Sequence, residues 1–167
     1  MATTSSFDIS TGADLQEVDN AVNQTVKEIT QRYDFKGTKC TVEFDRDKAE
    51  IRLAADDQFR MDALVDVLQT KMIKRGVPVK NLTVGDVVAG SGESVRRTVT
   101  LTQGIPTEAA KKIVKAIKEG GFKKVTSAIQ GDEVRVSSAS KDDLQEVIAF
   151  LRTQDFEIEL KFGNYRG

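Results

Sequence analysis

Alternating apolar and polar residues mark the strands of this chain, and apolar residues three and four apart mark its helices. After the two-residue turn Gly131-Asp132, Val134 and Val136 alternate with charged neighbours, which predicts the second strand of a β-hairpin. Ser140 then begins a helix-capping sequence. The apolar stripe of the helix that follows consists of Leu144, Val147, Ile148 and Leu151.

The same order of hairpin and helix occurs earlier in the chain. Glu50–Leu53 repeats the alternation of Glu133–Val136, and an amphipathic helix follows it from about residue 57 to 75. Gly76 ends that helix and Pro78 prevents its continuation. The repeat predicts two successive βαββαβ units.

The predicted elements define the expected fold. Strands are expected at residues 6–9, 39–44, 50–54, 79–84, 94–103, 125–130, 133–137 and 156–162. Helices are expected at residues 14–33, 57–75, 106–120 and 141–152. Glycines cluster at 85–92, which predicts a linker between a first unit at 1–89 and a second at 90–167. The fold class is α+β, a tandem of two ferredoxin-like sandwiches with antiparallel sheets. Units of about 80 residues are marginal alone, so tight packing of the two is expected.

Composition narrows the classes of function. The 167 residues include no histidine and one cysteine, Cys40, so nucleophile–histidine catalysis and a zinc site of Cys and His ligands are excluded. We therefore expect a protein that is not an enzyme and has no cofactor. The net charge is −1, which argues against a bulk electrostatic grip on nucleic acid. No run approaches membrane length and no signal peptide is seen, so a cytoplasmic protein is expected.

Three kinds of residue suggest ligand chemistry. Lys111, Lys115 and Lys118, beside Lys112, form a basic helical stripe suited to phosphate or nucleic acid. The alternative, favoured by general surface composition, is a solvated helix face. Tyr33–Gly37 and Phe162–Arg166 place aromatic residues beside cations, as base stacking with phosphate binding requires, although aromatic residues also commonly fill cores.

Turns supply the remaining candidates. Gln103-Gly104 and Gln130-Gly131-Asp132 offer close backbone approach and side chains that read base edges, but a simple turn requirement is the commoner reason for such sequences. No Walker or G-x-G-x-x-G loop occurs, and Glu50–Ala54 and Glu133–Ser137 lack the aromatics of an RNA-recognition sheet.

Several separated blocks together resemble the bacterial YajQ family. They are residues 6–9 (SFDI), 14–18 (DLQEV) with Asn20-Ala21, 32–37 (RYDFKG), 73–76 (IKRG), 103–105 (QGI), 110–118 (AKKIVKAIK), 129–136 (IQGDEVRV) and 142–145 (DDLQ). The resemblance covers nearly the whole chain and is weakest at 85–93. It implies tandem RNP-like domains whose first strands are exchanged, so that Phe7–Ser10 joins the C-terminal sheet. It also implies nucleotide binding, with links to cyclic di-GMP, GTP or ATP, and to tRNA.

Three hypotheses follow, all of them binding functions. The first is a nucleotide sensor, most plausibly for cyclic di-GMP, whose bound state is read by a transcription factor or other protein. The second is a tRNA or other nucleic-acid binder that uses the lysine stripe. The third is a protein-interaction module without a small ligand. No membrane partner is expected. The candidate nucleotide-binding residues are Arg32, Tyr33, Phe35, Lys36, Gly37, Lys74, Arg75, Gln103, Lys111, Lys112, Lys115, Gln130, Asp132, Tyr165 and Arg166.

Overall fold

The computed structural model describes residues 4–167, which form two compact α+β units. Unit 1 combines the residues up to Gly12 with Gln103–Gly167, and unit 2 is Ala13–Thr102. The expected contiguous boundary between 89 and 90 differs from this division. The reason lies in hydrogen bonding, because the first strand of the chain pairs within the C-terminal sheet, while the strand after the glycine-rich segment pairs within the N-terminal one.

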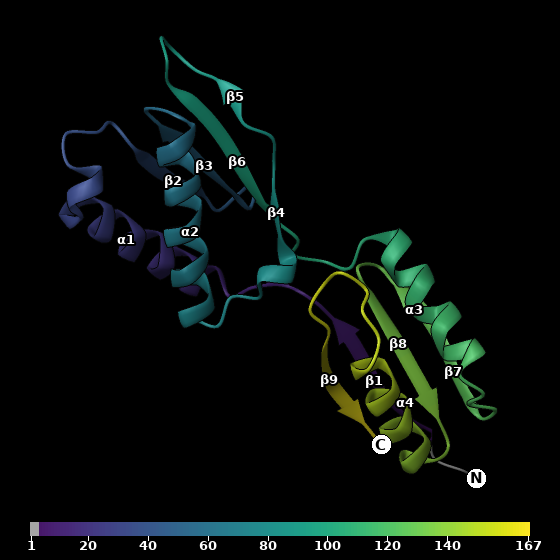
Figure 1. The fold of residues 1–167 in the computed structure, drawn as a ribbon. Helices are drawn as coiled ribbons and strands as arrows, with labels where there is room; N and C mark the ends of the chain where they lie inside the picture. Colours follow the sequence, from purple (N-terminus) through teal and green to yellow (C-terminus); the bar gives the residue numbers. More distant parts are fainter. Residues whose placement is uncertain (1–3) are drawn as a thin grey trace. The chain divides into compact units, whose positions relative to one another are not determined.

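Unit 2 is an antiparallel sheet with two helices, α1 and α2, on one face (Figure 1). The strand order is β2-β3-β6-β4, and β5 adds to the end of β6. The helices are α1 (Leu15–Gln31) and α2 (Gln58–Lys74), with 3-10 turns η1 (Tyr33–Phe35) and η2 (Val79–Asn81). The strands are β2 (Thr41–Asp45), β3 (Glu50–Ala55), β4 (Leu82–Val84), β5 (Val88–Ala89) and β6 (Val95–Leu101).

Local sequence explains where these helices begin and end. The side chains of Asp14 and Asp57 accept hydrogen bonds from the backbone N–H groups of Gln16 and Arg60, and so cap α1 and α2. Gly76 adopts a φ of 76° after α2, a left-handed conformation that suits glycine. The apolar faces of both helices cover a core that includes Ile51, Leu53 and Val99 of the sheet.

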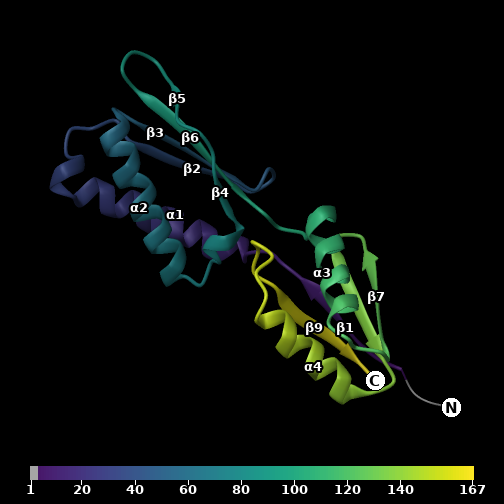
Figure 2. The same cartoon turned by 45° about the vertical axis from the view of Figure 1, so that its right-hand side comes forward.

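Unit 1 has the same kind of architecture, with α3 and α4 on one face of an antiparallel sheet (Figures 1 and 2). Its strand order is β7-β8-β1-β9. The helices are α3 (Thr107–Glu119) and α4 (Lys141–Arg152). The strands are β1 (Ser5–Ser10), β7 (Val125–Gln130), β8 (Glu133–Ser138) and β9 (Lys161–Arg166). The first strand lies in the middle of this sheet, between β8 and β9.

Strand β1 alternates between the two faces of the unit 1 sheet. Phe7 and Ile9 are fully buried in the core with Val134 and Val136 of β8. Ser6, Asp8 and Ser10 therefore point to the other side, which no helix covers and which we call the open face. Phe7 also contacts the rings of Phe162 and Tyr165 in β9.

Three expected segments differ from the structure. Of the expected strand at 79–84, only Leu82–Val84 is a strand, because the chain first makes the turn η2, in which the N–H of Asn81 donates to the carbonyl oxygen of Pro78. The segment 85–92 lies within unit 2, where it connects β4 with β6 and contributes the short strand β5. The last strand runs over Lys161–Arg166 rather than 156–162, because Glu157 adopts a positive φ of 65° and the chain bends before Lys161. Ile158 is nevertheless buried in the core of unit 1, which is why its apolar segment resembled a strand.

Candidate functional site

The predicted site residues divide between the two units. Unit 2 contains Arg32, Tyr33, Phe35, Lys36, Gly37, Lys74 and Arg75. Unit 1 contains Gln103, Lys111, Lys112, Lys115, Gln130, Asp132, Tyr165 and Arg166.

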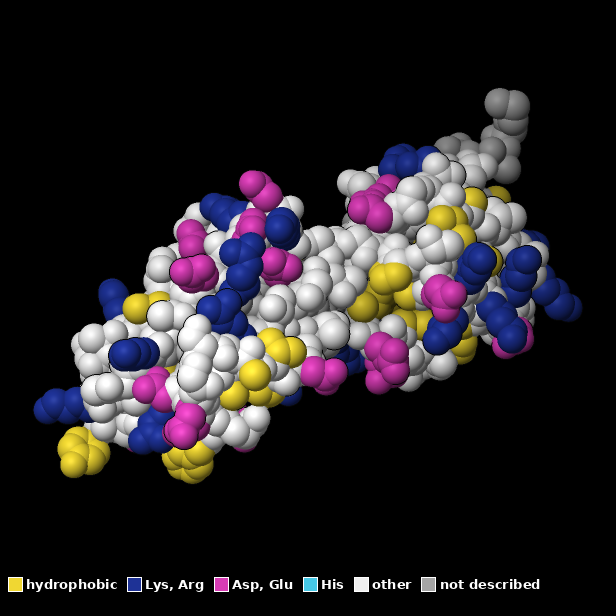
Figure 3. Space-filling view, turned by 90° about the horizontal axis from the view of Figure 1, so that it is seen from above, with side chains coloured by type: hydrophobic (Ala, Val, Ile, Leu, Met, Phe, Trp, Pro, Cys, Tyr) yellow, Lys and Arg dark blue, Asp and Glu magenta, His cyan; other side chains and the backbone are white. Residues whose placement is uncertain are grey.

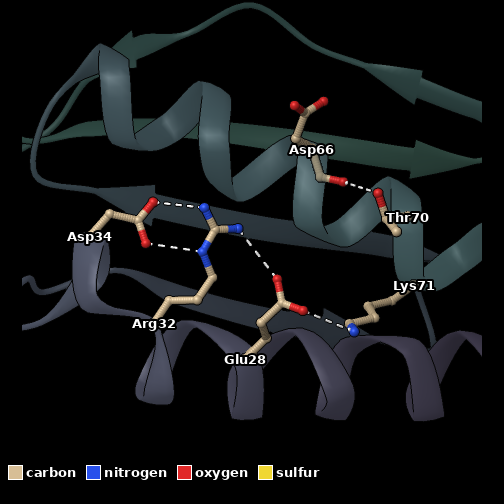
Figure 4. Close-up of polar contacts among 6 residues, drawn as sticks. All are labelled: Glu28, Arg32, Asp34, Asp66, Thr70 and Lys71. Atoms are coloured by element: carbon tan, nitrogen blue, oxygen red, sulfur yellow. Dashed lines mark hydrogen bonds and ion pairs between the residues drawn. The ribbon is translucent and has the colours of Figure 1, made fainter.

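Arg32 forms ion pairs with carboxylates of its own unit, unit 2. Its Nη2 lies 2.7 Å from Asp34 Oδ2, and its Nη1 lies 3.3 Å from Glu28 Oε2 (Figure 4). Lys71 of α2 approaches the other oxygen of Glu28 at 3.0 Å. Hydrogen bonds from Lys71 and Arg32 lower the pKa of Glu28, and those to Asp34 and Glu28 raise the pKa of Arg32. The cluster pairs two cations with two anions and has little charge left for a phosphate.

The turn after α1 separates its aromatic side chains. Tyr33 is 89% exposed, whereas Phe35 is 4% exposed and belongs to the core of unit 2. The ring of Phe35 therefore has no face free to stack on a base. Of the two alternatives for this aromatic residue, filling of the core explains its position. Lys36 and Gly37 line a groove of about 490 Å³ beside β2, together with Phe35, Thr38 and Thr41 among others.

The end of α2 contributes one further predicted cation to an internal ion pair. Arg75 Nε lies 2.9 Å from Glu17 Oε2 of α1. Lys74, one residue earlier, is exposed. The two basic residues that are adjacent in sequence are therefore in different situations, and only Lys74 presents its charge to solvent.

The predicted turns of unit 1 come together. The N–H of Ile105 donates a hydrogen bond of 2.9 Å to the carbonyl oxygen of Asp132. A Cβ atom on Gly104 would lie 2.5 Å from Asp132 Oδ2, so glycine is required by close packing of the two turns. Gly131 has a φ of 64°, as the first position of a type II′ hairpin turn needs. These geometric requirements explain both glycines without a ligand.

Tyr165 and Arg166 line a cavity of about 250 Å³ in unit 1, which we call the C-terminal pocket. Lys141 and Gln145, from the first turns of α4, line it as well. Tyr165 is 60% exposed, and one side of its ring packs 6.2 Å from Phe7. An exposed aromatic ring, two cations and an amide thus meet in one hollow, although sequence analysis had not selected Lys141 or Gln145.

A buried carboxylate lies next to this pocket on the open face. The carboxylate of Asp8 accepts hydrogen bonds from Arg166 Nη2 at 2.9 Å, Arg135 Nε at 3.0 Å and Asn164 Nδ2 at 3.1 Å. The Asp8 side chain is 6% exposed. The bond from Arg166, followed by those from Arg135 and Asn164, outweighs the effect of burial and lowers the pKa of Asp8 to about 2.

An irregularity in β9 creates this cluster. The register shifts between Ser6 and Asp8, where two steps on β1 correspond to three on β9, and Asn164 adopts a φ of 53°. The extra residue brings Arg166 to the side of Asp8 and turns Tyr165 toward Phe7. Sequence analysis missed Asp8 and Arg135. A signal was present, since both are charged residues between two apolar neighbours in a strand.

The predicted lysine stripe lies along a second hollow of unit 1. Lys111, Lys115 and Lys118 of α3 line a shallow groove of about 440 Å³ with Val114 and with Ser127–Ile129 of β7. We call it the α3–β7 groove. Lys112 is exposed but does not line it. Figure 3 shows Lys and Arg side chains gathered over unit 1, at the right of the view.

No group of three or more His, Cys, Asp or Glu side chains within residues 4–167 is arranged to hold a metal ion. None of the described helices combines the length and apolar character that crossing a membrane requires.

The fold and these hollows define a two-unit α+β protein with surface hollows in each unit. The family model described as "Nucleotide-binding protein YajQ-like" matches residues 5–166, so the chain belongs to the YajQ family. It is 54% identical over 161 residues to the "Nucleotide-binding protein Mmc1_1670" of Magnetococcus marinus, covering 96% of this chain and 98% of that one. It is 50% identical over 161 residues, with the same coverage, to a "Nucleotide-binding protein" of Citrifermentans bemidjiense. The family resemblance seen in the sequence is thus confirmed.

Proposed function

We propose that this protein binds a nucleotide in the C-terminal pocket and acts by binding rather than by catalysis. The observation that carries the proposal is the meeting of Tyr165, Arg166, Lys141 and Gln145 around one cavity. The names of the relatives, nucleotide-binding proteins, support the class of ligand.

Each side chain of the pocket has a chemical role in this proposal. The exposed face of Tyr165 offers a stacking surface for a base, while Phe7 supports the ring from the core. Lys141 is exposed and, among the described residues, no ion pair occupies it, so its ammonium group is available to a phosphate. Arg166 keeps its guanidinium in place through Asp8 and Ser6.

A guanine nucleotide is the ligand that we propose, with cyclic di-GMP first. Two cations, Lys141 and Arg166, match two phosphates, and the amide of Gln145 can both donate to and accept from the edge of a guanine. The cavity of about 250 Å³ has room for one base, so the rest of the ligand would extend over the surface. We place this activity in the cytoplasm. The single cysteine, Cys40, has no second cysteine with which to form a disulfide within the chain, as is usual for proteins of a reducing compartment.

Calorimetric titration with cyclic di-GMP and GTP, at low and physiological salt, tests the proposal. Tyr165→Leu retains an apolar side chain against Phe7 but removes the stacking ring, so it should raise Kd roughly tenfold or more. Lys141→Ala should also weaken binding. Tyr33→Leu, at an exposed tyrosine of unit 2, is the matched control and should leave Kd unchanged.

Two further variants examine the other predicted surfaces. Lys36→Ala tests the groove beside β2, and Lys111→Ala tests the α3–β7 groove. If either of them abolishes nucleotide binding while Tyr165→Leu does not, the ligand lies elsewhere and the C-terminal pocket is the wrong site. Failure of both nucleotides to bind at micromolar concentration would remove the proposed function itself.

The tRNA hypothesis rests on the lysines of α3. Binding of tRNA through them would weaken steeply as salt rises, because each phosphate contact releases counterions. The cations that define the stripe lie on one face of a helix of 13 residues, which limits the number of phosphates they reach. We therefore rank this function second, and titration of tRNA at two salt concentrations tests it.

We also propose that each unit is a ferredoxin-like sandwich whose first strands are exchanged. The pairing of β1 with β8 and β9, and of β6 with β3 and β4, supports this. With β1 and β6 counted as first strands, both sheets have the order 4-1-3-2 of the split βαβ motif. Deleting residues 1–10 should then unfold unit 1 and leave unit 2 folded, as judged by amide NMR signals. A folded unit 1 would contradict the proposal.

A further inference from the structure

The outer edge of the unit 1 sheet is formed by β7, which pairs only with β8 (Figure 2). An edge strand presents a row of backbone N–H and C=O groups that lack a strand partner. β7 is six residues long, from Val125 to Gln130, and contains neither proline nor a charged side chain. The devices that commonly block an edge are thus absent from the strand itself.

The register identifies which backbone groups face outward. Gly131-Asp132 is a two-residue turn, so Gln130 and Glu133 flank it as a hydrogen-bonded pair. Pairing alternates along an antiparallel ladder, and Ile129 and Ser127 therefore direct their N–H and C=O groups away from β8. Their side chains point to the helix side, because their partners Val134 and Val136 are buried in the core.

The α3–β7 groove runs along this free edge. Ile129 is 40% exposed, and Val114 of α3 extends the apolar floor. Lys111, Lys115 and Lys118 line the same groove from α3 and are exposed. Within residues 4–167, Lys115 alone of the three lies within 4 Å of a carboxylate, at 3.9 Å from Glu119 Oε1, and both side chains are more than two-thirds exposed. The groove therefore combines unpaired backbone, apolar floor and three cations.

We propose that the α3–β7 groove binds an extended acidic segment of a partner protein, which adds to the sheet as a strand beside β7. The backbone groups of Ser127 and Ile129 would pair with the segment, and every second side chain of the segment would then face α3. Among these groove-facing side chains, apolar ones would rest on Ile129 and Val114, and carboxylates would face the lysines. Charge complementarity selects the acidic character, and the free edge selects the extended conformation.

A peptide fits this groove better than a nucleic acid does. The residues that line it include no aromatic ring and no arginine, which single-stranded nucleic acids use for stacking. An apolar floor of Val114 and Ile129 offers nothing to a phosphate backbone, whereas it accommodates valine or isoleucine side chains of a strand.

The test uses the full chain labelled with 15N and a short peptide whose alternate, groove-facing positions carry glutamate and valine in turn, with threonine between them. Binding should shift the amide signals of Ser127 and Ile129 and slow their hydrogen exchange, while Thr126 and Ala128, already bonded to β8, change less. The same peptide with prolines in alternate positions should not bind. The triple variant Lys111→Glu, Lys115→Glu, Lys118→Glu should raise Kd at least tenfold, and the corresponding triple arginine variant should retain binding.

One backbone variant separates strand pairing from simple charge attraction. Ser127→Pro removes an outward N–H and leaves the ladder to β8 intact, so the chain should stay folded while the peptide no longer binds. Ser127→Thr is its control and should bind normally. Equal binding of the proline peptide, shifts confined to lysine side chains, or tighter binding of a single-stranded oligonucleotide at the groove would each overturn the proposal. A further outcome would also overturn the proposal: a variant with Lys111, Lys115 and Lys118 all changed to Ala that self-associates but does not bind the peptide. The lysines would then serve to prevent pairing of β7 with a second copy of the chain.

Discussion

Replacing the buried carboxylate of Asp8 should destabilise unit 1. In the folded protein its pKa is lowered from 3.8 to about 2 by Arg166, Arg135 and Asn164. A difference of nearly two pKa units corresponds to about 2 kcal/mol of stability at neutral pH. Asp8→Asn retains the shape but removes the charge that two guanidinium groups share, so the free energy of unfolding should fall by about 2 kcal/mol or somewhat more.

The pH dependence gives this prediction its sharper test. Because the pKa is lower in the folded state than in the unfolded chain, the stabilisation is fully present above the unfolded pKa and is lost as the pH falls toward 2. The difference between wild type and Asp8→Asn should therefore be constant at pH 6–7, shrink below about pH 4 and nearly vanish near pH 2.

The assay is denaturant unfolding followed by tyrosine fluorescence. The chain has no tryptophan and two tyrosines, Tyr33 in unit 2 and Tyr165 in unit 1. A Tyr33→Phe background therefore reports unit 1 alone. Glu119→Gln, which removes an exposed partner of Lys115 in the same unit, is the control and should leave the stability of unit 1 almost unchanged. Equal stability of Asp8→Asn and wild type at pH 7, or a difference that persists at pH 2, would refute the reasoning.

Three further variants test other parts of the argument. Phe7→Ala should cost about 3–5 kcal/mol in unit 1, because its side chain is fully buried; a loss confined to the Tyr33 signal of unit 2 would contradict the assignment of β1. Asp57→Ala removes the N-terminal cap of α2, so the free energy of unfolding of unit 2 should fall by about 1 kcal/mol, as measured by thermal unfolding. Asp57→Ser keeps a capping oxygen and should retain most of that stability. Glu28→Gln should change stability by less than about 1 kcal/mol, since its side chain is 36% exposed, and a larger loss by denaturant titration would show that the cluster is less screened than its exposure indicates.

Much of the local structure could be predicted because it depends on neighbours in the sequence. The four helices follow from apolar stripes and from capping residues such as Asp14 and Ser140, and their bounds agree within a few residues. The hairpin at Gly131-Asp132 follows from a turn that needs a positive φ at its first position. Residues 156–160 were misassigned because an apolar segment that reaches the core need not be a strand.

The candidate site was predictable only in part. Tyr165 and Arg166 were selected for an aromatic ring beside a cation, and they do line a pocket. Strict alternation would have placed Tyr165 on the open face. The bulge in β9 instead turns Tyr165 toward Phe7 and places Arg166 where it can bond to Asp8. Lys141 and Gln145 reach the pocket from another element, and no pattern within α4 distinguishes them from other exposed polar residues.

By itself, the sequence determined the order of the helices and of most strands, the family, and the absence of histidine chemistry, because these depend on residue identity and short-range spacing. The alternation of residues did not decide which sheet receives β1 and β6. The family resemblance implied the place of β1, and the tertiary structure gives the neighbours of both strands. Any sheet that covers the apolar side of an alternating strand can accommodate it, so the alternation does not indicate which strands will be its neighbours. The ion pairs of the buried Asp8 with Arg135 and Arg166 follow from that choice, since three strands distant in sequence must lie side by side before their side chains meet.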